Sequence, residues 1–137
     1  MLYIPKFAEE FTEKKLYAEF QVRNNGGIRP TRKNRAIILI NSFFSDYQGG
    51  YEDGVDEKTG FVYYVGEGDK DQKMVRNNKS ILESKQKGYT LLYFEKPKRD
   101  TLIFKFPLEY VSWSYKKQIN FQGILRQVIV FKLKIIE

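Results

Sequence analysis

Residues 46–72 combine carboxylates with glycines and tyrosines. Eight acids lie in this segment: Asp46, Glu52, Asp53, Asp56, Glu57, Glu67, Asp69 and Asp71. Carboxylates accept hydrogen bonds from amines, tyrosine rings stack on flat groups, and glycines let the backbone approach a ligand closely. The segment therefore has the residue types of a pocket for a flat group that carries an amine.

The chain contains neither Cys nor His among its 137 residues. This excludes disulfides, thiolate nucleophiles, histidine bases and the common zinc sites, and we predict no metal and no cofactor. The length predicts a single domain over residues 1–137, as part of a longer protein or complex. No stretch approaches the ~18 apolar residues of a membrane span, so we predict a cytoplasmic protein with no membrane partner.

Charge is distributed unevenly along the chain. Residues 46–72 carry eight acids against Lys58 and Lys70, a net charge of −6; the whole chain carries +7, so the remainder carries +13. A basic body around an acidic segment suits a polyanionic partner, and the 10 Tyr, 11 Phe and 1 Trp favour nucleic acid over a membrane surface. A surface made soluble by lysine is the simpler alternative.

Hydrophobic patterns predict the elements that must position these residues. Residues 5–20 have helical spacing, and residues 76–88 predict a second helix with Asn77 or Asn78 as its cap and Gly88 as its end. Apolar and β-branched runs predict strands at 35–44, 60–66, 89–96, 101–117 and 125–136. Together these elements predict an α+β domain built on a small curled sheet or barrel.

Three motifs follow one another in the sequence: "GGYEDGVD" (49–56), "YYVGEG" (63–68) and "RNNKSILES" (76–84), with "GGIRP" (26–30) upstream. Their order and spacing resemble those of SRA domains, which flip a methylated cytosine out of DNA. The form without a long insert between strand and helix is similar to the SRA-like modules of type IV, Mcr-like restriction systems. The resemblance implies an SRA/PUA-like fold, and the missing insert implies no preference for hemimethylated sites.

The resemblance also implies which residues form the base pocket. Tyr51 and Tyr64 match the two tyrosines that stack on the flipped base. Gly54 stands where the family has the aspartate that reads the cytosine amino group, and Asp53 is its nearest substitute. Glu67 aligns with a small residue near the methyl group, where a carboxylate would accept from an amine or a hydroxymethyl group. The implied pocket residues are Gly50, Tyr51, Asp53, Gly54, Tyr64, Val65 and Glu67. The alternative is that both tyrosines are ordinary core residues.

Polar residues on both sides of the pocket in the sequence are predicted to contact the DNA backbone. They are Arg29, Arg32, Lys33, Arg35, Lys73, Arg76, Asn78 and Lys79. The alternative for each basic residue is a place on a solvated surface.

The predicted function is recognition of double-stranded DNA that carries 5-methylcytosine or 5-hydroxymethylcytosine, as the targeting module of a modification-dependent restriction system. We predict no enzymatic activity in this chain; a nuclease or an AAA+ motor would lie on another domain or partner. Two alternatives remain. One is a metal-dependent nuclease using Asp71, Glu83 and Lys85, and the other is a PUA-like RNA-binding module.

Overall fold

The computed structural model describes residues 4–23, 26–42, 54–56, 58–68, 70–119 and 122–136, with Gly54 and Asp56 described by their backbone alone. Ten elements follow one another in these ranges: β1 (Glu10–Phe11), α1 (Glu13–Phe20), β2 (Ile28–Thr31), β3 (Ala36–Ser42), β4 (Gly54–Asp56), β5 (Phe61–Val65), α2 (Arg76–Leu82), β6 (Thr90–Lys98), β7 (Thr101–Ile119) and β8 (Leu125–Ile135). The predicted α+β class is confirmed.

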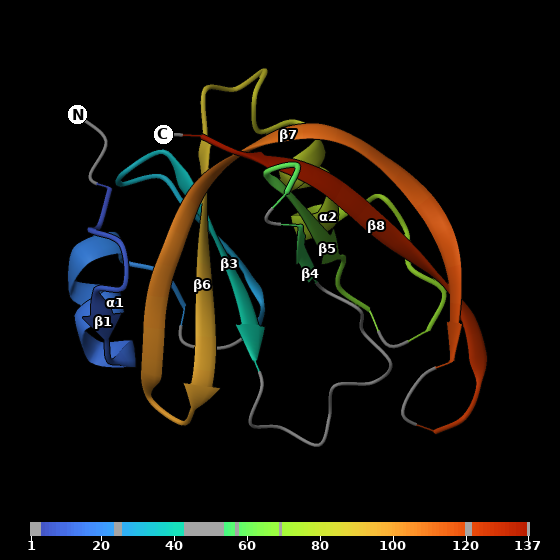
Figure 1. Ribbon diagram of the computed structural model, residues 1–137, viewed down its shortest axis with the longest axis horizontal. Coiled ribbons are helices and arrows are strands. Elements are labelled where there is room, and N and C mark those ends of the chain that lie inside the picture. Colours follow the sequence, from blue (N-terminus) through green and yellow to red (C-terminus); the bar gives the residue numbers. More distant parts are fainter. Residues whose placement is uncertain are drawn as a thin grey trace.

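One curled sheet of eight strands organises the described part of the chain (Figure 1). Its order is β2-β3-β6-β7-β8-β5-β4, and β1 pairs with β7 outside this path. β3 and β6 run parallel, and the other pairs are antiparallel. The long strand β7 arcs over the molecule and joins its two halves, because its first part pairs with β6 and its second part with β8.

The sheet is buried on both faces around β3 and β6. Along β3, Ile37 and Leu39 enter one core cluster, whereas Ile38 and Ile40 enter the other. Successive side chains of a strand point to opposite faces, so a strand buried on both faces needs an uninterrupted apolar run. The run "AIILI" has this property, and the strand predicted over 35–44 is confirmed as β3.

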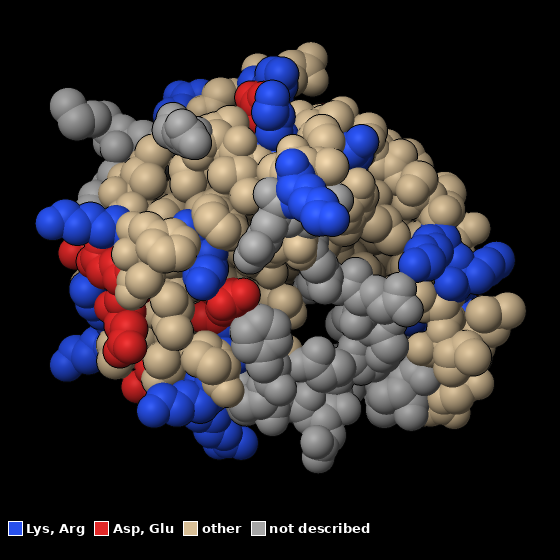
Figure 2. Space-filling model, in the orientation of Figure 1, with Lys and Arg blue, Asp and Glu red and all other residues tan. Residues whose placement is uncertain are grey.

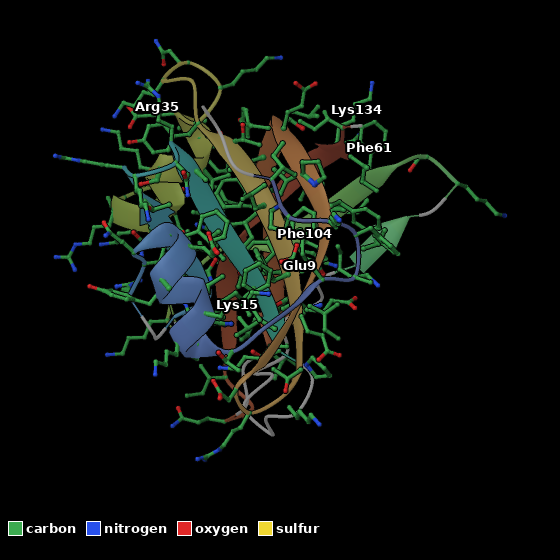
Figure 3. All side chains as sticks on the ribbon, turned by 90° about the vertical axis from the view of Figure 1, so that its left-hand side faces the viewer. Glu9, Lys15, Arg35, Phe61, Phe104 and Lys134 are labelled. Carbon is green, nitrogen blue, oxygen red and sulfur yellow. The ribbon has the colours of Figure 1, made fainter. Side chains whose placement is uncertain are left out.

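Helix α1 covers one of the two cores and is shorter than predicted. The Thr12 side chain accepts a hydrogen bond from the Lys15 N–H at 3.0 Å, so the helix begins at residue 13. Phe11, predicted to be helical, instead lies in β1, pairs with β7 and is 2% exposed. Lys15 also forms an ion pair with Glu9 at 3.2 Å, on the side of the molecule seen in Figure 3. Because the buried Phe11 ring belongs to the sheet, the strand includes residue 11, and the Thr12 cap begins the helix directly after it.

Helix α2 covers the other core through Ile81. It ends at Leu82, earlier than predicted, and Gly88 lies beyond it in a turn with φ +74°. The predicted asparagine cap is wrong: Val75 is the capping residue, without a side-chain cap bond, and Asn78 is a buried residue inside the helix. The Asn78 side chain instead forms hydrogen bonds with backbone groups of Glu67 and Lys73.

Candidate nucleic-acid interface

The glycine-rich segment after β5 is bound to the first part of β8, which lies beyond the residues that pair with β5. The Gly66 N–H donates to the Ile129 carbonyl at 2.9 Å. The buried Gln72 side chain accepts from the Ile129 N–H at 2.8 Å and donates to the carbonyls of Gly66 at 2.7 Å and Gly68 at 3.0 Å. Arg126 donates to the Gly68 carbonyl as well. These bonds leave the backbone of this segment little freedom relative to the sheet.

Asn78 anchors the same segment from α2. Its Oδ1 accepts from the Glu67 N–H at 2.8 Å, and its Nδ2 donates to the carbonyls of Glu67 at 3.1 Å and Lys73 at 3.0 Å. A Cβ at Gly66 would lie 2.7 Å from Asn78 Oδ1, so only glycine leaves room for this amide. The contact of Asn78 with the DNA backbone stays a prediction that this structure does not favour, because the residue is 4% exposed and its amide is occupied by the protein backbone.

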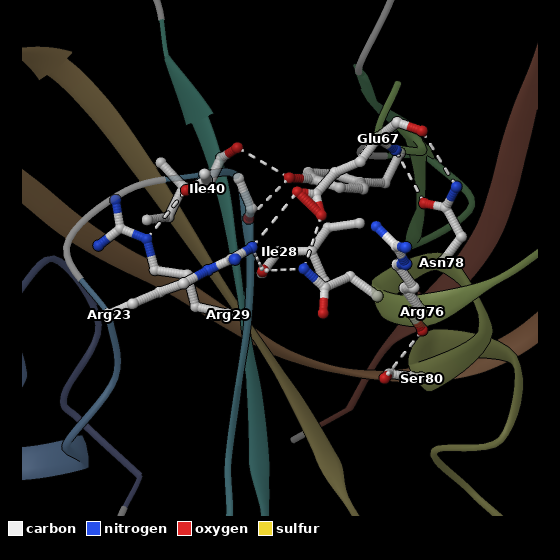
Figure 4. A network of polar contacts seen from close by, with 12 residues as sticks. Arg23, Ile28, Arg29, Ile40, Glu67, Arg76, Asn78 and Ser80 are labelled. Carbon is white, nitrogen blue, oxygen red and sulfur yellow. Dashed lines mark hydrogen bonds and ion pairs between the residues drawn. The ribbon is translucent and has the colours of Figure 1, made fainter. Parts of the chain in front are cut away.

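The Glu67 carboxylate links α2 to the chain before β2. Its Oε1 accepts from Asn77 Nδ2 at 2.8 Å, and its Oε2 lies 3.6 Å from the guanidinium of Arg23 (Figure 4). Asn77 Nδ2 and Arg23 also donate to the Ile28 carbonyl, each at 3.2 Å. Both oxygens of Glu67 therefore face protein groups. These partners of Glu67 were not predicted from the sequence.

A polar cavity of about 430 Å³ lies around this carboxylate. Three cations line it, Arg23, Lys73 and Arg76, together with the acids Glu67 and Asp71. Lys73 and Arg76 were predicted as backbone contacts, and the structure places both in this cavity. Arg23 was missed; its only sequence signal was its place just before the "GGIRP" motif. The arrangement provides a cationic surface beside the segment that follows β5.

Arg29 does not belong to this surface. Its guanidinium donates to both oxygens of Glu13, at 2.8 and 3.1 Å, and to the Gly26 carbonyl at 2.9 Å. Only 3% of its side chain is exposed. The phosphate contact of Arg29 stays a prediction that this structure does not favour, because a DNA strand would have to displace a buried, paired guanidinium. Arg29 instead ties α1 to the turn before β2.

Three other predicted cations lie at the opposite end of β3. Arg32, Lys33 and Arg35 belong to the turn that leads into β3, whereas Gly27 pairs with Ile40 near the end of that strand. A strand rises about 3.3 Å per residue, so the two ends of this seven-residue strand are about 20 Å apart. The fold thus separates these cations from the cavity that holds Lys73 and Arg76.

The cations of this turn contact neighbouring backbone and ring groups. Arg35 has φ +48°, donates to the Lys87 carbonyl at 2.7 Å and lies over the ring of Tyr89 at 5.7 Å. Lys33 donates to the Ala18 carbonyl at 3.3 Å. Their side chains remain exposed, as does that of Lys79 on α2. Arg32, Lys33 and Arg35 form a second basic surface at this end of β3.

The charged side chains of one face are visible in Figure 2. Among the described residues on this face, most acids gather over α1, where Lys and Arg side chains lie beside them, and further Lys and Arg are spread around the outline. The acids of residues 46–72 whose side chains the structure describes are Glu67 and Asp71.

Comparison with known families decides the identity of the fold. A sequence model of the family described as "ScoMcrA-like, SRA domain" matches residues 8–137. The chain belongs to this SRA family. The predicted relationship to SRA domains is thus confirmed, and it extends well beyond the motifs that first indicated it. No curated protein sequence matches the domain significantly.

Solved structures of similar fold include SRA domains and restriction enzymes. The domain is similar to "Sulfur binding domain and SRA domain of ScoMcrA complexed with phosphorothioated DNA", with a TM-score of 0.75, 21% identity and coverage of 97% of this chain and 40% of that one. It is similar to "Crystal structure of SUVH5 SRA- methylated CHH DNA complex", with a TM-score of 0.67, 18% identity and coverage of 99% and 92%. The "DNA modification-dependent restriction endonuclease AspBHI" gives a TM-score of 0.65, 19% identity and coverage of 90% and 37%. The chain spans less than half of the ScoMcrA and AspBHI chains.

Within this SRA domain, Tyr64 has the contacts of a core residue. It is 3% exposed, and its hydroxyl lies within hydrogen-bonding distance of the carbonyls of Ile40 at 2.9 Å and Gly27 at 3.0 Å. The ring of Tyr93 meets the Tyr64 ring edge-on at 6.4 Å between centroids. Stacking on a base needs an open ring face, so the stacking role of Tyr64 stays a prediction and requires a rearrangement around the ring.

The other predicted pocket residues fall into two groups. Gly50, Tyr51 and Asp53 lie outside the described residues, and their roles stay predictions. Gly54 pairs with Tyr63 between β4 and β5, and Val65 is 6% exposed at the end of β5. The structure thus places Gly54, Tyr64, Val65 and Glu67 on or next to the β4–β5 hairpin.

The structure does not bring the residues of the nuclease alternative together. Asp71 accepts a backbone hydrogen bond from β8 at 2.7 Å, Glu83 pairs with Lys87 at 3.2 Å, and Lys85 pairs with Glu109 at 4.0 Å. Among the described residues, no group of three or more acids could hold a metal ion. No helix in the described ranges is long and apolar enough to cross a membrane.

Proposed function

We propose that this SRA domain binds modified double-stranded DNA and takes the modified base out of the helix into an aromatic pocket. The observation that carries the proposal is the family match over residues 8–137. Similar solved structures are described as complexes with phosphorothioated, methylated and hydroxymethylated DNA. Flipping a base costs a few kcal/mol, and base–aromatic stacking returns roughly 1–3 kcal/mol per ring. Tyr51 and Tyr64 are the proposed rings.

The cationic cavity supports this proposal by its position. Lys73 and Arg76 are exposed beside the glycine segment that follows β5, and no described residue forms an ion pair with either of them. Phosphate contacts position a protein on a duplex without reading its sequence. We therefore propose that this cavity holds the DNA backbone next to the flipped nucleotide.

The proposed modification is of the 5-methylcytosine or 5-hydroxymethylcytosine type. Asp53 is the proposed acceptor for the cytosine amino group. An acceptor role of Glu67 requires that its carboxylate first give up a partner, because Asn77 and Arg23 already face its two oxygens. The selectivity of the pocket is therefore assigned to the motif at residues 49–56 rather than to Glu67.

We propose that the domain acts as a targeting module and has no catalytic activity of its own. The chain covers 28% of the protein described as "Structure of the Type IV phosphorothioation-dependent restriction endonuclease ScoMcrA", which leaves most of that chain to other tasks. A nuclease or an AAA+ motor on another domain or partner is the proposed companion.

A panel of otherwise identical duplexes tests the proposal. It contains C, 5-methyl-C, 5-hydroxymethyl-C, N4-methyl-C and N6-methyl-A, a duplex with a phosphorothioate linkage, and a structured RNA of equal length. We expect at least one modified-base duplex to bind about tenfold or more tightly than its unmodified twin, because one base-edge contact contributes about 1–3 kcal/mol. Equal affinity for all DNA duplexes would overturn the proposal, and a preference for the RNA would favour the PUA-like alternative.

A further inference from the structure

The carboxylate of Glu67 lies among the cations that the proposed function assigns to DNA. In Figure 4, the Arg23 and Arg76 side chains lie on opposite sides of this carboxylate. Lys73 lines the same cavity. We infer that the cavity is a phosphate site and that Glu67 occupies the place of the phosphate until a DNA strand binds. The inference rests on the proposed function for the source of the phosphate.

The backbone of Glu67 is fixed, whereas its carboxylate is held, among the described residues, only by one hydrogen bond from Asn77 Nδ2 and one long ion pair. Asn78 binds both the N–H and the carbonyl of Glu67, so the main chain stays in place. The ion pair with Arg23 is long, 3.6 Å, and the side chains of Arg23 and Glu67 are 50% and 33% exposed. Exposed pairs of this kind contribute little free energy, so an incoming anion can replace this carboxylate by side-chain rotation alone.

Arg23 keeps its position when the carboxylate leaves. Arg23 also donates to the Ile28 carbonyl at 3.2 Å, which holds its guanidinium beside the cavity. Arg76 has φ +52°, a conformation that costs free energy for a residue other than glycine and often occurs at functional sites. No described residue forms an ion pair with Arg76 or Lys73. Of the two described acids that line the cavity, Asp71 accepts from the Gln127 N–H, and Glu67 is the one that pairs with a cation of the site.

This arrangement gives Glu67 a role opposite to that of a base-reading carboxylate. A phosphate must compete with Glu67 for Arg23, so Glu67 weakens binding of every duplex, modified or not. A reading carboxylate would instead strengthen binding of the modified duplex alone. Glu67→Gln separates the two roles, because glutamine can still accept from Asn77 Nδ2 but carries no charge.

The first arm of the test measures duplex affinity at low salt. Glu109→Gln is the matched control, because Glu109 forms a similar exposed pair, 4.0 Å from Lys85, and its replacement changes the net charge equally. We expect Glu67→Gln to bind unmodified and modified duplexes about two- to fivefold more tightly than both wild type and Glu109→Gln, the range of a weak surface pair. Unchanged or weaker binding by Glu67→Gln would overturn the inference.

The second arm needs no DNA. The side-chain Nε–H signals of Arg23 and Arg76 are followed by NMR while inorganic phosphate is added, with chloride at equal ionic strength as control. We expect phosphate to shift both signals and to saturate at lower concentration in Glu67→Gln. Absence of a phosphate-specific shift overturns the inference, even if duplex affinity changes. If phosphate binds in this way but no duplex does, the inference stands and the proposed function fails.

Discussion

Gly27 and Tyr64 lie so close together that a Cβ added at Gly27 would come within 2.9 Å of the Tyr64 hydroxyl oxygen. The same hydroxyl lies 3.0 Å from the Gly27 carbonyl and 2.9 Å from that of Ile40. Glycine is needed here for its missing side chain, since no positive φ is recorded at this position. The contact joins the "GGIRP" motif to the "YYVGEG" motif, so the two motifs depend on each other in the folded domain.

Gly27→Ala should destabilise the domain. The buried Tyr64 ring has little room to move, so the added methyl group forces either the ring or the β2 backbone to shift. We expect a loss of about 1–3 kcal/mol in the free energy of unfolding, measured with urea. In the background of Tyr64→Phe the same change should cost less, because the atom that clashes is gone. Equal costs in both backgrounds would mean that the contact is not the cause.

Asn78→Ala should loosen the segment that carries Glu67. The change leaves the Glu67 N–H and carbonyl and the Lys73 carbonyl without their partner, and we expect a loss of about 1–3 kcal/mol. Hydrogen exchange of the Glu67 amide should accelerate. Asn34→Ala is the control, because within the described part of the chain its side chain donates one hydrogen bond, to the Glu19 carbonyl at 3.0 Å, and it should cost less. Unaltered exchange at Glu67 would contradict the anchoring role.

The two basic surfaces should differ in their effect on DNA binding. Neutralising Lys73 and Arg76 together should make the slope of log affinity against log salt shallower by about 1.8, since each phosphate contact contributes about 0.9. Neutralising Arg32 and Lys33 removes the same charge at the other end of β3 and should leave the slope nearly unchanged. Equal changes for both pairs would show that the strand passes over both surfaces.

Arg29 should matter for stability rather than for DNA binding. Arg29→Met leaves Glu13 with the longer pair to Lys96, at 3.9 Å, so the loss in the free energy of unfolding should stay below the about 3–5 kcal/mol of a fully broken buried pair. Replacing Glu13 by leucine in the same molecule should recover much of this loss, because both charges are then absent. Folded protein of the double variant should bind duplex DNA as wild type does. A selective loss of DNA affinity would restore Arg29 as a phosphate contact.

The predictable part of the fold depends on long apolar runs. The five predicted strands are confirmed as β3, β5, β6, β7 and β8, with ends that differ by a few residues. Strands β1, β2 and β4 were missed, since each has only two to four residues. Such a strand is defined by its pairing with a neighbouring strand and not by a pattern of its own. A strand this short has too few residues to reveal an alternation.

The sequence by itself determined the family, the α+β class and the glycine motifs, because these depend on residue types at fixed local spacing. The tertiary structure decided which charged side chains are available. Arg29 and Arg32 are three residues apart, yet one is buried against Glu13 and the other is exposed at the end of the sheet. Arg23 and Arg76 are far apart in sequence, yet they line one cavity around Glu67. Pairing partners and burial are set by contacts between distant segments, which no local pattern encodes.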